Sequence, residues 1–215
     1  MELLELIKKR RSIRKFKNVL IERDKLLKVL EAAHWAPTAG NLQSWKFIVV
    51  KDKRKRQQLA EAAFNQMWMT EAPVFIVVNA FTDKIKRYYG VRGERLYAVQ
   101  ECAAAIENMI LEAESLGLAT CWVGAFDEAA AKRILDIPDN VRPQAILILG
   151  YGDETPPVPS KYKLKDVVYF EKYKATREEF FPLEKQVKFV AERAEPLIER
   201  LKGKVVDVVT RKKKK

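Results

Sequence analysis

Three polar residues near the N-terminus, each two positions from the next, are well suited to bind an anion. Arg10, Ser12 and Arg14 share one face if residues 10–16 are extended, at steps of about 6.6 Å. Arginine can pair with phosphate through two parallel hydrogen bonds and keeps its charge, so this face fits an elongated anion. The alternative is a basic surface stretch that binds nothing.

A second candidate is the loop at residues 36–45, where polar side chains alternate with small residues. The preceding helix pattern ends before Pro37, because a residue before proline disfavours the helical region. Thr38, Asn41 and Gln43 offer hydroxyl and amide groups that could hydrogen-bond the edge of a planar heterocycle. The alternative is an ordinary capped loop.

A third candidate is Gly124, which follows a predicted buried strand and precedes Ala125. Glycine at a strand end lets the backbone approach a ligand closely and donate N–H groups. The alternative is a turn that requires glycine for its own conformation.

Other kinds of site have too few parts in this sequence. His34 is the only histidine, which disfavours a histidine-based triad or metal centre, and the P-loop and Gly-x-Gly-x-x-Gly patterns are absent. We therefore predict no catalytic side chain and no metal, and expect a bound cofactor to carry any reaction. Cys102 and Cys121 indicate neither a disulfide framework nor a zinc site, and a reducing cytoplasm fits them best. The apolar runs are too short to span a membrane, and the acidic first residues do not match a secretion signal.

The elements that must position these candidates follow from apolar periodicity. We predict helices at residues 2–9, 22–35, 53–69, 93–116, 127–135 and 178–202, and strands at residues 47–50, 74–78, 121–123, 145–149 and 167–170. A stiff proline connection lies at residues 156–159, and a short apolar segment at residues 205–209 follows the last helix. The helix at residues 93–116 is apolar nearly all round its Ala-rich part, which predicts central burial, with Gly117 as its left-handed cap. The pattern predicts an α+β domain with a central sheet between helices and a C-terminal extension.

The charge balance raises a rival function. The chain has 41 Lys and Arg against 29 Asp and Glu, a net charge of +12, of which five positive charges lie in the tail at residues 211–215. A nucleic-acid-binding protein could use Arg10, Arg11, Arg14 and this tail, but it needs aromatic platforms on the same exposed face. The motif aromatics Trp45, Trp122 and Phe126 adjoin predicted buried strands, so we expect no nucleic-acid partner.

Taken together, the motifs resemble the nitroreductase family of FMN-dependent NAD(P)H oxidoreductases. The resemblance covers residues 2–173 in the family's order. It rests on Arg-Arg-Ser-Ile-Arg-Lys-Phe at residues 10–16, Ala-Pro-Thr-Ala-Gly-Asn-Leu-Gln-Ser-Trp at 36–45, Phe-Asn-Gln at 64–66 before Ala-Pro-Val at 72–74, Gly-Leu-Ala-Thr-Cys-Trp-Val-Gly-Ala-Phe at 117–126, and Leu-Gly-Tyr-Gly at 149–152.

The resemblance implies a three-layer α+β fold with a central mixed sheet flanked by helices, in an intertwined homodimer whose subunits share two FMN sites. The strand at residues 167–170 would cross to the partner's sheet. Residues 1–173 would form the FMN-binding domain and residues 174–215 a C-terminal helical extension with a basic tail. The protein would be cytoplasmic, with no membrane partner.

The resemblance also implies roles for particular residues. The cofactor-binding set would be Arg10, Arg11, Ser12, Arg14, Pro37, Thr38, Ala39, Asn41, Gln43, Asn65, Gly124, Ala125 and Lys161. Within it, Arg10 and Ser12 would hold the phosphate and ribityl end, and Arg14 and Asn65 would face the pyrimidine edge. Residues 37–39 would come from the other subunit, and the backbone N–H groups of residues 124–125 would support flavin N5.

Two positions depart from the family's pattern. Lys161 stands where the family usually has arginine, with Lys163 nearby, so either lysine could complete the phosphate site without a planar fork. Trp68 stands at an often basic position, which suggests altered nicotinamide or substrate contacts.

The implied reaction is a ping-pong transfer. Hydride from NADH or NADPH would pass to flavin N5, and two electrons would then pass to a small acceptor such as a nitroaromatic compound or a quinone. A specialised branch of the family, performing flavin destruction, dehalogenation or ene reduction, is the alternative, because the fold does not determine the acceptor.

Overall fold

The structure, a computed structural model, describes residues 2–177 of the 215-residue chain. The chain divides into two compact units, Met1–Val158 and Pro159–Lys215, and each is described by itself. The predicted domain boundary after residue 173 stays a prediction. The helix predicted at residues 178–202 and the apolar segment at residues 205–209 lie outside the described residues.

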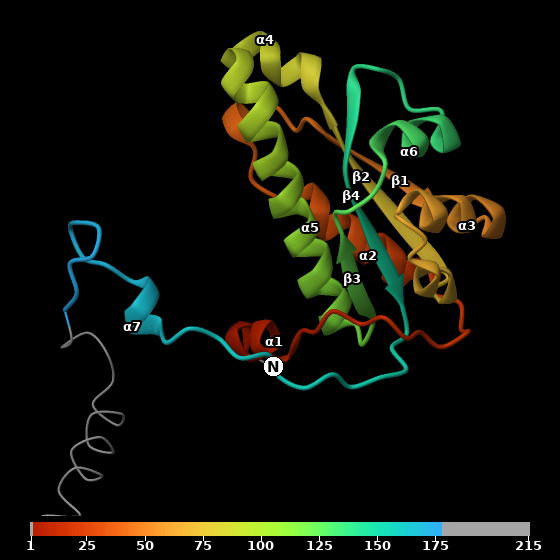
Figure 1. Ribbon diagram of the computed structural model, residues 1–215, viewed down its shortest axis with the longest axis horizontal. Helices are drawn as coiled ribbons and strands as arrows, with labels where there is room; N and C mark the ends of the chain where they lie inside the picture. The colour runs from red at the N-terminus through yellow and green to blue at the C-terminus, as the bar shows by residue number, and fades with distance from the viewer. Residues whose placement is uncertain (1, 178–215) are drawn as a thin grey trace, which may run out of the picture. The chain divides into compact units, whose positions relative to one another are not determined.

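A four-stranded sheet forms the centre of the first unit (Figure 1). Its strands are β1 (Trp45–Val50), β2 (Val74–Phe81), β3 (Ala119–Val123) and β4 (Val141–Gly150). They lie in the order β1-β2-β4-β3, and each neighbouring pair is antiparallel. The prediction of a mixed sheet is therefore wrong for these four strands. Strands covered on both faces are continuous apolar runs in either direction, so the sequence pattern could not determine strand direction.

The helices of the described residues agree in large part with the prediction. They are α1 (Leu3–Lys9), α2 (Arg23–His34), α3 (Lys53–Ala62), α4 (Thr82–Arg92), α5 (Ala98–Ser115), α6 (Glu128–Leu135) and α7 (Leu164–Val167), with the short turns η1 (Ala39–Asn41), η2 (Met67–Glu71) and η3 (Gly93–Tyr97). None of these helices has both the length and the apolar composition needed to cross a bilayer.

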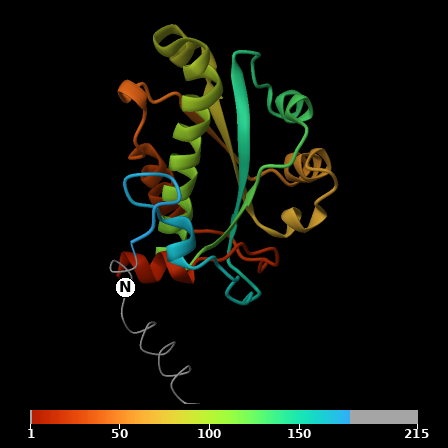
Figure 2. The ribbon, with the colours of Figure 1, turned by 60° about the vertical axis from the view of Figure 1, so that its left-hand side comes forward.

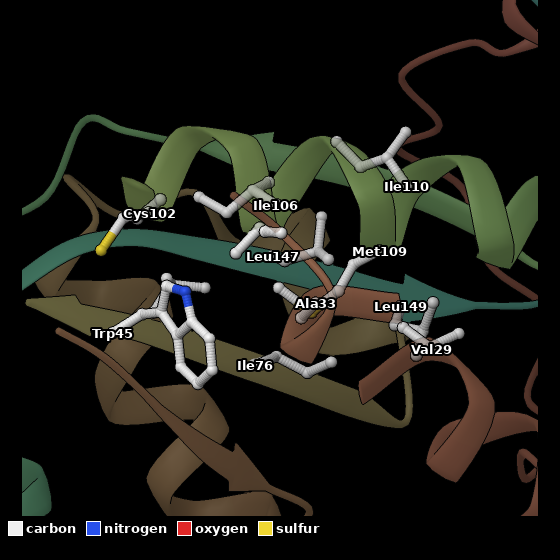
Figure 3. Close-up of a cluster of buried hydrophobic side chains, with 14 of the residues drawn as sticks. Val29, Ala33, Trp45, Ile76, Cys102, Ile106, Met109, Ile110, Leu147 and Leu149 are labelled. Atoms are coloured by element: carbon white, nitrogen blue, oxygen red, sulfur yellow. The ribbon is translucent and has the colours of Figure 1, made fainter. Parts of the chain in front are cut away.

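Helices cover both faces of the sheet, which produces three layers (Figure 2). On one face, Ile76 and Leu147 pack with buried residues of α2 and α5 (Figure 3). On the other face, Phe75 and Ile148 pack with buried residues of α3 and α6. Successive strand residues point to opposite faces, so each central strand contributes to both layers.

The end of α5 is a Schellman motif, and Gly117 is its left-handed cap, as predicted. Gly117 has a φ of 72°, and its N–H donates to Glu114 O at 3.1 Å. The Leu118 N–H donates to Ala113 O at 2.8 Å. This motif satisfies carbonyls of the last turn and directs the chain into β3.

The burial predicted for α5 is wrong in extent, because the chain covers only one of its faces. Its core residues include Ala105, Ile106 and Met109, which are fully buried, whereas Val99 is 38% exposed. The neighbouring helix α1 buries no residue within the chain, although it carries several large apolar side chains. Leu3, Leu4 and Ile7 of α1 and Val99 of α5 are therefore apolar side chains that the chain itself leaves exposed.

Two further predictions differ from the structure, and one helix was not predicted. The helix predicted at residues 53–69 ends at Ala62, because Phe64 and Asn65 adopt positive φ values of 58° and 60°, before η2 begins. No strand forms at residues 167–170 within the described residues, where α7 ends at Val167. A strand that pairs with another chain forms no hydrogen-bonded ladder inside its own chain, so the predicted pairing with a partner's sheet stays a prediction. Helix α4 was not predicted, and it is broken at Gly90, where φ is 59° and ψ is −151°.

The close packing around Gly150 yields a prediction. A Cβ at Gly150 would lie 2.8 Å from Phe16 Cδ1 and 3.0 Å from Pro73 Cδ, whereas one at Gly124 would meet nothing closer than 3.9 Å. Gly150→Ala should therefore lower the free energy of unfolding by about 1–3 kcal/mol. Gly124→Ala, the matched control, should change it by less than about 0.5 kcal/mol. Denaturant unfolding of the two variants measures both values, and equal stabilities would contradict the packing described here.

Candidate active site

The basic N-terminal segment lies along the outer edge of β3. Ser12 forms an isolated parallel bridge with Thr120, and the Ile13 N–H donates to Thr120 O at 2.9 Å. Phe16 bridges Gly152 after the end of β4. Ile13 and Phe16 are buried and act as anchors, whereas Arg14 is exposed.

Two carboxylates fix the backbone of this segment. Glu154 Oε1 accepts hydrogen bonds from the N–H groups of Arg14 and Lys15, at 2.5 and 3.1 Å. Glu71 Oε2 accepts one from the Phe16 N–H at 3.1 Å. Sequence reasoning missed both residues, because each lies far along the chain from the residues it binds and belongs to no recognised motif.

The Arg10 and Arg14 side chains form no ion pair with any described residue. The Arg14 guanidinium carbon lies 5.9 Å from the ring centroid of Trp68, in a cation–π contact. Burial raises the pKa of Cys121 in β3, and the charges of Arg14 and Arg10 oppose that shift. The positive charge of both arginines therefore acts at the same strand and is available to an anion.

Arg11 is used differently from its two neighbours. Its Nη1 donates to the carbonyl oxygens of Lys8, Lys9 and Arg10, at 2.7, 3.1 and 2.8 Å. These contacts satisfy carbonyls at the C-terminus of α1, where a cation also complements the helix dipole. The structure thus gives the Arg11 side chain a helix-capping role, and its predicted contact with a cofactor stays a prediction.

The loops after α3 and β3 meet beyond the end of β3. Gln66 Nε2 donates to Ala125 O at 3.4 Å, and the Asp127 N–H donates to Ala62 O at 2.8 Å. Asn65, next to Gln66, is exposed in a left-handed conformation. The structure therefore brings Asn65 and Ala125 to neighbouring positions in this part of the first unit.

Gly124 has no structural requirement for glycine in the described residues. Its φ is not positive, and an added Cβ would meet only Trp122 Nε1, at 3.9 Å. The alternative that this turn requires glycine for its own conformation is therefore wrong. Open space over the backbone is the arrangement that close approach of a ligand would need.

The second predicted group, the loop at residues 37–44, is held at the other edge of the sheet, next to β1. Glu101 of α5 is 4% exposed and accepts hydrogen bonds from the Ala39 N–H at 2.9 Å and from Ser44 Oγ at 2.5 Å. Within the loop, Thr38 Oγ1 accepts a hydrogen bond from the Gln43 N–H at 3.2 Å. Sequence reasoning missed Glu101, because a single glutamate in a helix gives no signal of the distant backbone groups that it binds.

The two predicted groups lie at opposite ends of α5. The loop is bound near the N-terminus of α5 by Glu101, whereas the start of the basic segment is near its C-terminus, where Lys9 pairs with Glu114 at 3.3 Å. At about 1.5 Å per residue, these two anchors are roughly 20 Å apart along the helix. Figure 1 shows the same separation, with the loop beside α4 and the basic segment below β3. One chain alone therefore does not assemble the predicted site.

The remaining predicted residues and the clefts add to this result. Lys161 and Lys163 are exposed in the second unit, so their predicted role stays a prediction. Two clefts of about 560 and 420 Å³ open on the first unit, and no predicted site residue lines either of them. Of the motif aromatics, Trp45 and Phe126 are buried and Trp122 is 40% exposed, so they form no shared exposed platform for nucleic-acid bases.

Comparison with known proteins identifies close relatives. The profile of the nitroreductase family matches residues 7–70 and 64–151. A protein of Archaeoglobus fulgidus, provisionally named NADH dehydrogenase/NAD(P)H nitroreductase, is 37% identical over 155 residues, which are 70% of this chain and 85% of the relative. An NADH dehydrogenase of Thermus thermophilus is 32% identical over 68% of this chain and 84% of its own length.

Solved structures agree in fold. The NADPH:FMN oxidoreductase of Vibrio harveyi, in complex with NAD⁺, has a TM-score of 0.74 and 26% identity, and the match covers 82% of this chain and 80% of that one. An FMN-dependent nitroreductase of Clostridium difficile has a TM-score of 0.69 and 28% identity, covering 79% of this chain and 99% of that one.

The two cysteines beside the candidate residues should be unreactive in the folded protein. Burial, with a further contribution from Glu101, raises the pKa of Cys102 to about 12, and burial raises that of Cys121. At pH 8 only about one Cys102 side chain in ten thousand would be the reactive thiolate. We expect iodoacetamide to modify both thiols at least a hundredfold more slowly in the native protein than in guanidinium, as measured by mass spectrometry. Rapid labelling of either residue in the native protein would contradict this expectation.

Proposed function

The chain belongs to the nitroreductase family, and from that premise we propose that it is an FMN-dependent oxidoreductase. We propose that it takes reducing equivalents from NADH or NADPH and passes two electrons to a small acceptor. The observation that carries the proposal is the pair of guanidinium groups of Arg10 and Arg14, which lie beside β3 and form no ion pair with a described residue. The open backbone at Gly124 follows the end of the same strand. The names of the Vibrio harveyi and Clostridium difficile proteins support FMN as the cofactor.

The residues present are suited to FMN. A phosphate needs cationic or N–H donors, which Arg10 and Ser12 would supply with the fixed backbone of the segment. Arg14 and Asn65 would meet the polar edge of the isoalloxazine ring. Arg11 would act by fixing the start of the segment at the end of α1.

The protein's own contribution to the chemistry would be electrostatic and positional. When bound, FMN supplies the atom that accepts and returns hydride, so no side chain has to act as nucleophile. The Arg14 charge would stabilise negative charge at the ring edge, and backbone N–H groups at residues 124–125 would fix the orientation of the ring. Trp68 would limit where Arg14 can move, since it lies under the guanidinium.

We propose that the site is completed by a second copy of this chain. The loop residues Pro37, Thr38, Ala39, Asn41 and Gln43 lie too far from Arg10 to share a ligand with it inside one chain. The apolar side chains of α1 support this arrangement, because Leu3, Leu4 and Ile7 are 64%, 57% and 44% exposed. Burial of such a surface is the main driving force of stable homodimers.

The remaining finer assignments are part of the same proposal. We propose a nitroaromatic compound or a quinone as the acceptor, with Lys161 or Lys163 contributing to the phosphate site, and a cytoplasmic location. The specialised branches, which perform flavin destruction, dehalogenation or ene reduction, are distinguished by assaying loaded protein against each class of acceptor.

FMN titration tests the proposal and separates the arginines. The wild-type protein should bind one FMN per chain and melt at a higher temperature when FMN is added. Arg10→Ala should weaken FMN binding by about 10- to 150-fold, since a charge-assisted hydrogen bond contributes roughly 1.5–3 kcal/mol. Arg14→Ala should chiefly slow the reduction of bound FMN by NAD(P)H. Arg11→Ala is the control: it should lower the melting temperature of FMN-free protein more than Arg10→Ala or Arg14→Ala does.

The readouts are quenching of FMN fluorescence, stopped-flow absorbance and thermal melting. A wild-type protein that neither contains flavin nor responds to it would exclude the proposed function. Equal loss of FMN affinity in the Arg10 and Arg14 variants, with normal reduction once loaded, would assign both residues to the phosphate.

Mixed dimers test whether two chains share each site. Arg10→Glu damages one half of the site, and Pro37→Trp, at an exposed loop position, damages the other half. Each variant alone should be nearly inactive. When the two are co-expressed, random pairing makes half of the dimers mixed, and each mixed dimer carries one undamaged site, so activity should recover to about a quarter of wild type. No recovery in purified mixed dimers would contradict a shared site.

A further inference from the structure

We propose that Glu101 is a positioning residue: its buried carboxylate fixes the conformation in which the loop at residues 37–44 is presented to the partner chain's cofactor. This inference rests on the proposed function for its consequence, but its structural basis lies within one chain. Within that chain, a single carboxylate joins both ends of the loop.

The Glu101 carboxylate binds the loop with both oxygens. Oε1 accepts from the Ala39 N–H at 2.9 Å, and Oε2 accepts from Ser44 Oγ at 2.5 Å and the Ser44 N–H at 3.3 Å. The loop is thus closed across one side chain of α5. A backbone N–H bound to a carboxylate has a strong, charge-assisted partner, so small shifts of the loop are opposed from both ends.

The carboxylate is buried without an ion pair in the described part of the chain. Glu101 lies in α5, whose helical backbone continues without a break from η3, so no free helix N-terminus compensates its charge. Its compensation comes from the three hydrogen bonds of the loop. A buried charge is costly unless its donors are in place, so any loop conformation that withdraws them is disfavoured.

The loop conformation needs such support, because its backbone is strained at one residue. Gln43 has a φ of 52°, in the left-handed region that residues other than Gly, Asn and Asp rarely adopt. Gly40 and Asn41, at 54° and 55°, tolerate this region. Gly40 also lies against Tyr89 of α4, whose hydroxyl would be 2.6 Å from an added Cβ. The strain would be relieved by a different loop conformation, and the bonds to Glu101 oppose that change.

The consequence for the proposed reaction is indirect. Glu101 lies beneath the loop, whereas Pro37, Gly40 and Asn41 are exposed on it. In the proposed dimer, this exposed surface would flank the cofactor bound by the other chain. Glu101 would therefore control how closely the loop approaches the cofactor, and with it the rate of electron transfer, without touching the reacting atoms.

The test uses Glu101→Gln, which keeps the size of the side chain but replaces one accepting oxygen with a donor that faces N–H or O–H groups. Glu107→Gln is the matched control, because Glu107 is an exposed glutamate of the same helix. Ser44→Ala removes only the Oγ contact, and it serves as the milder variant if Glu101→Gln does not fold.

Three measurements are made on each full-length variant. Hydrogen exchange of the Ala39 and Ser44 amides reports the loop in FMN-free protein. Circular dichroism in the flavin bands reports the surroundings of bound FMN, and stopped-flow reduction by NAD(P)H gives the rate constant per bound FMN. We expect Glu101→Gln to raise exchange at both amides at least tenfold, to change the flavin bands and to lower the rate constant at least tenfold.

The control and the milder variant set the scale. Glu107→Gln should stay within twofold of wild type in all measurements, and Ser44→Ala should change them in the same direction by about threefold. A lower melting temperature for Glu101→Gln with unchanged loop exchange, flavin bands and rate constant per FMN would overturn the proposal, because that is the result of a purely structural role. If wild-type protein binds no FMN, the proposed function fails separately, and the two amide exchange rates still decide whether Glu101 fixes the loop.

Discussion

The burial of β2 and β4 on both faces is the constraint on which the rest of the structure depends. Every residue of β2 except the last is buried, and so are the last six residues of β4. The centre of the sheet is therefore almost entirely apolar, since a buried polar group needs partners. The exception in β2 is Asn79, whose Nδ2 donates to Lys46 O and Val77 O. The candidate polar groups lie at the two edges, where the basic segment runs beside β3 and the polar loop precedes β1. The separation of the two halves of the candidate site is a direct result.

Local features of this fold were predictable from sequence. The glycine after α5, Asp127 at the start of α6 and the apolar runs of the strands each act within a few residues, so a linear pattern carries them. Long-range contacts were not predictable in this way. Glu71, Glu101 and Glu154 bind backbone N–H groups of distant segments, and a lone glutamate has no pattern that reveals its partner. The resemblance supplied the list of candidate residues, but not their distribution between two edges.

The three glutamates also revise what the charge balance means. A net charge of +12 drew attention to the cationic groups, yet within the candidate site it is carboxylates that hold the main chain in place. Arginine itself serves two purposes: Arg11 binds the last carbonyls of α1, whereas Arg10 and Arg14 form no ion pair with any residue between 2 and 177. Neighbouring residues of one type thus differ in role because of the carbonyls or open space around them.

The bridges from Ser12 to Thr120 and from Phe16 to Gly152 determine when the N-terminal segment can fold during synthesis. The N-terminal segment leaves the ribosome first, but its partners on β3 and after β4 are made much later. Contacts between such distant parts of a chain form late, since the loop between them must close first. A nascent chain therefore carries its arginines without the strand that orients them until nearly the whole first unit has emerged.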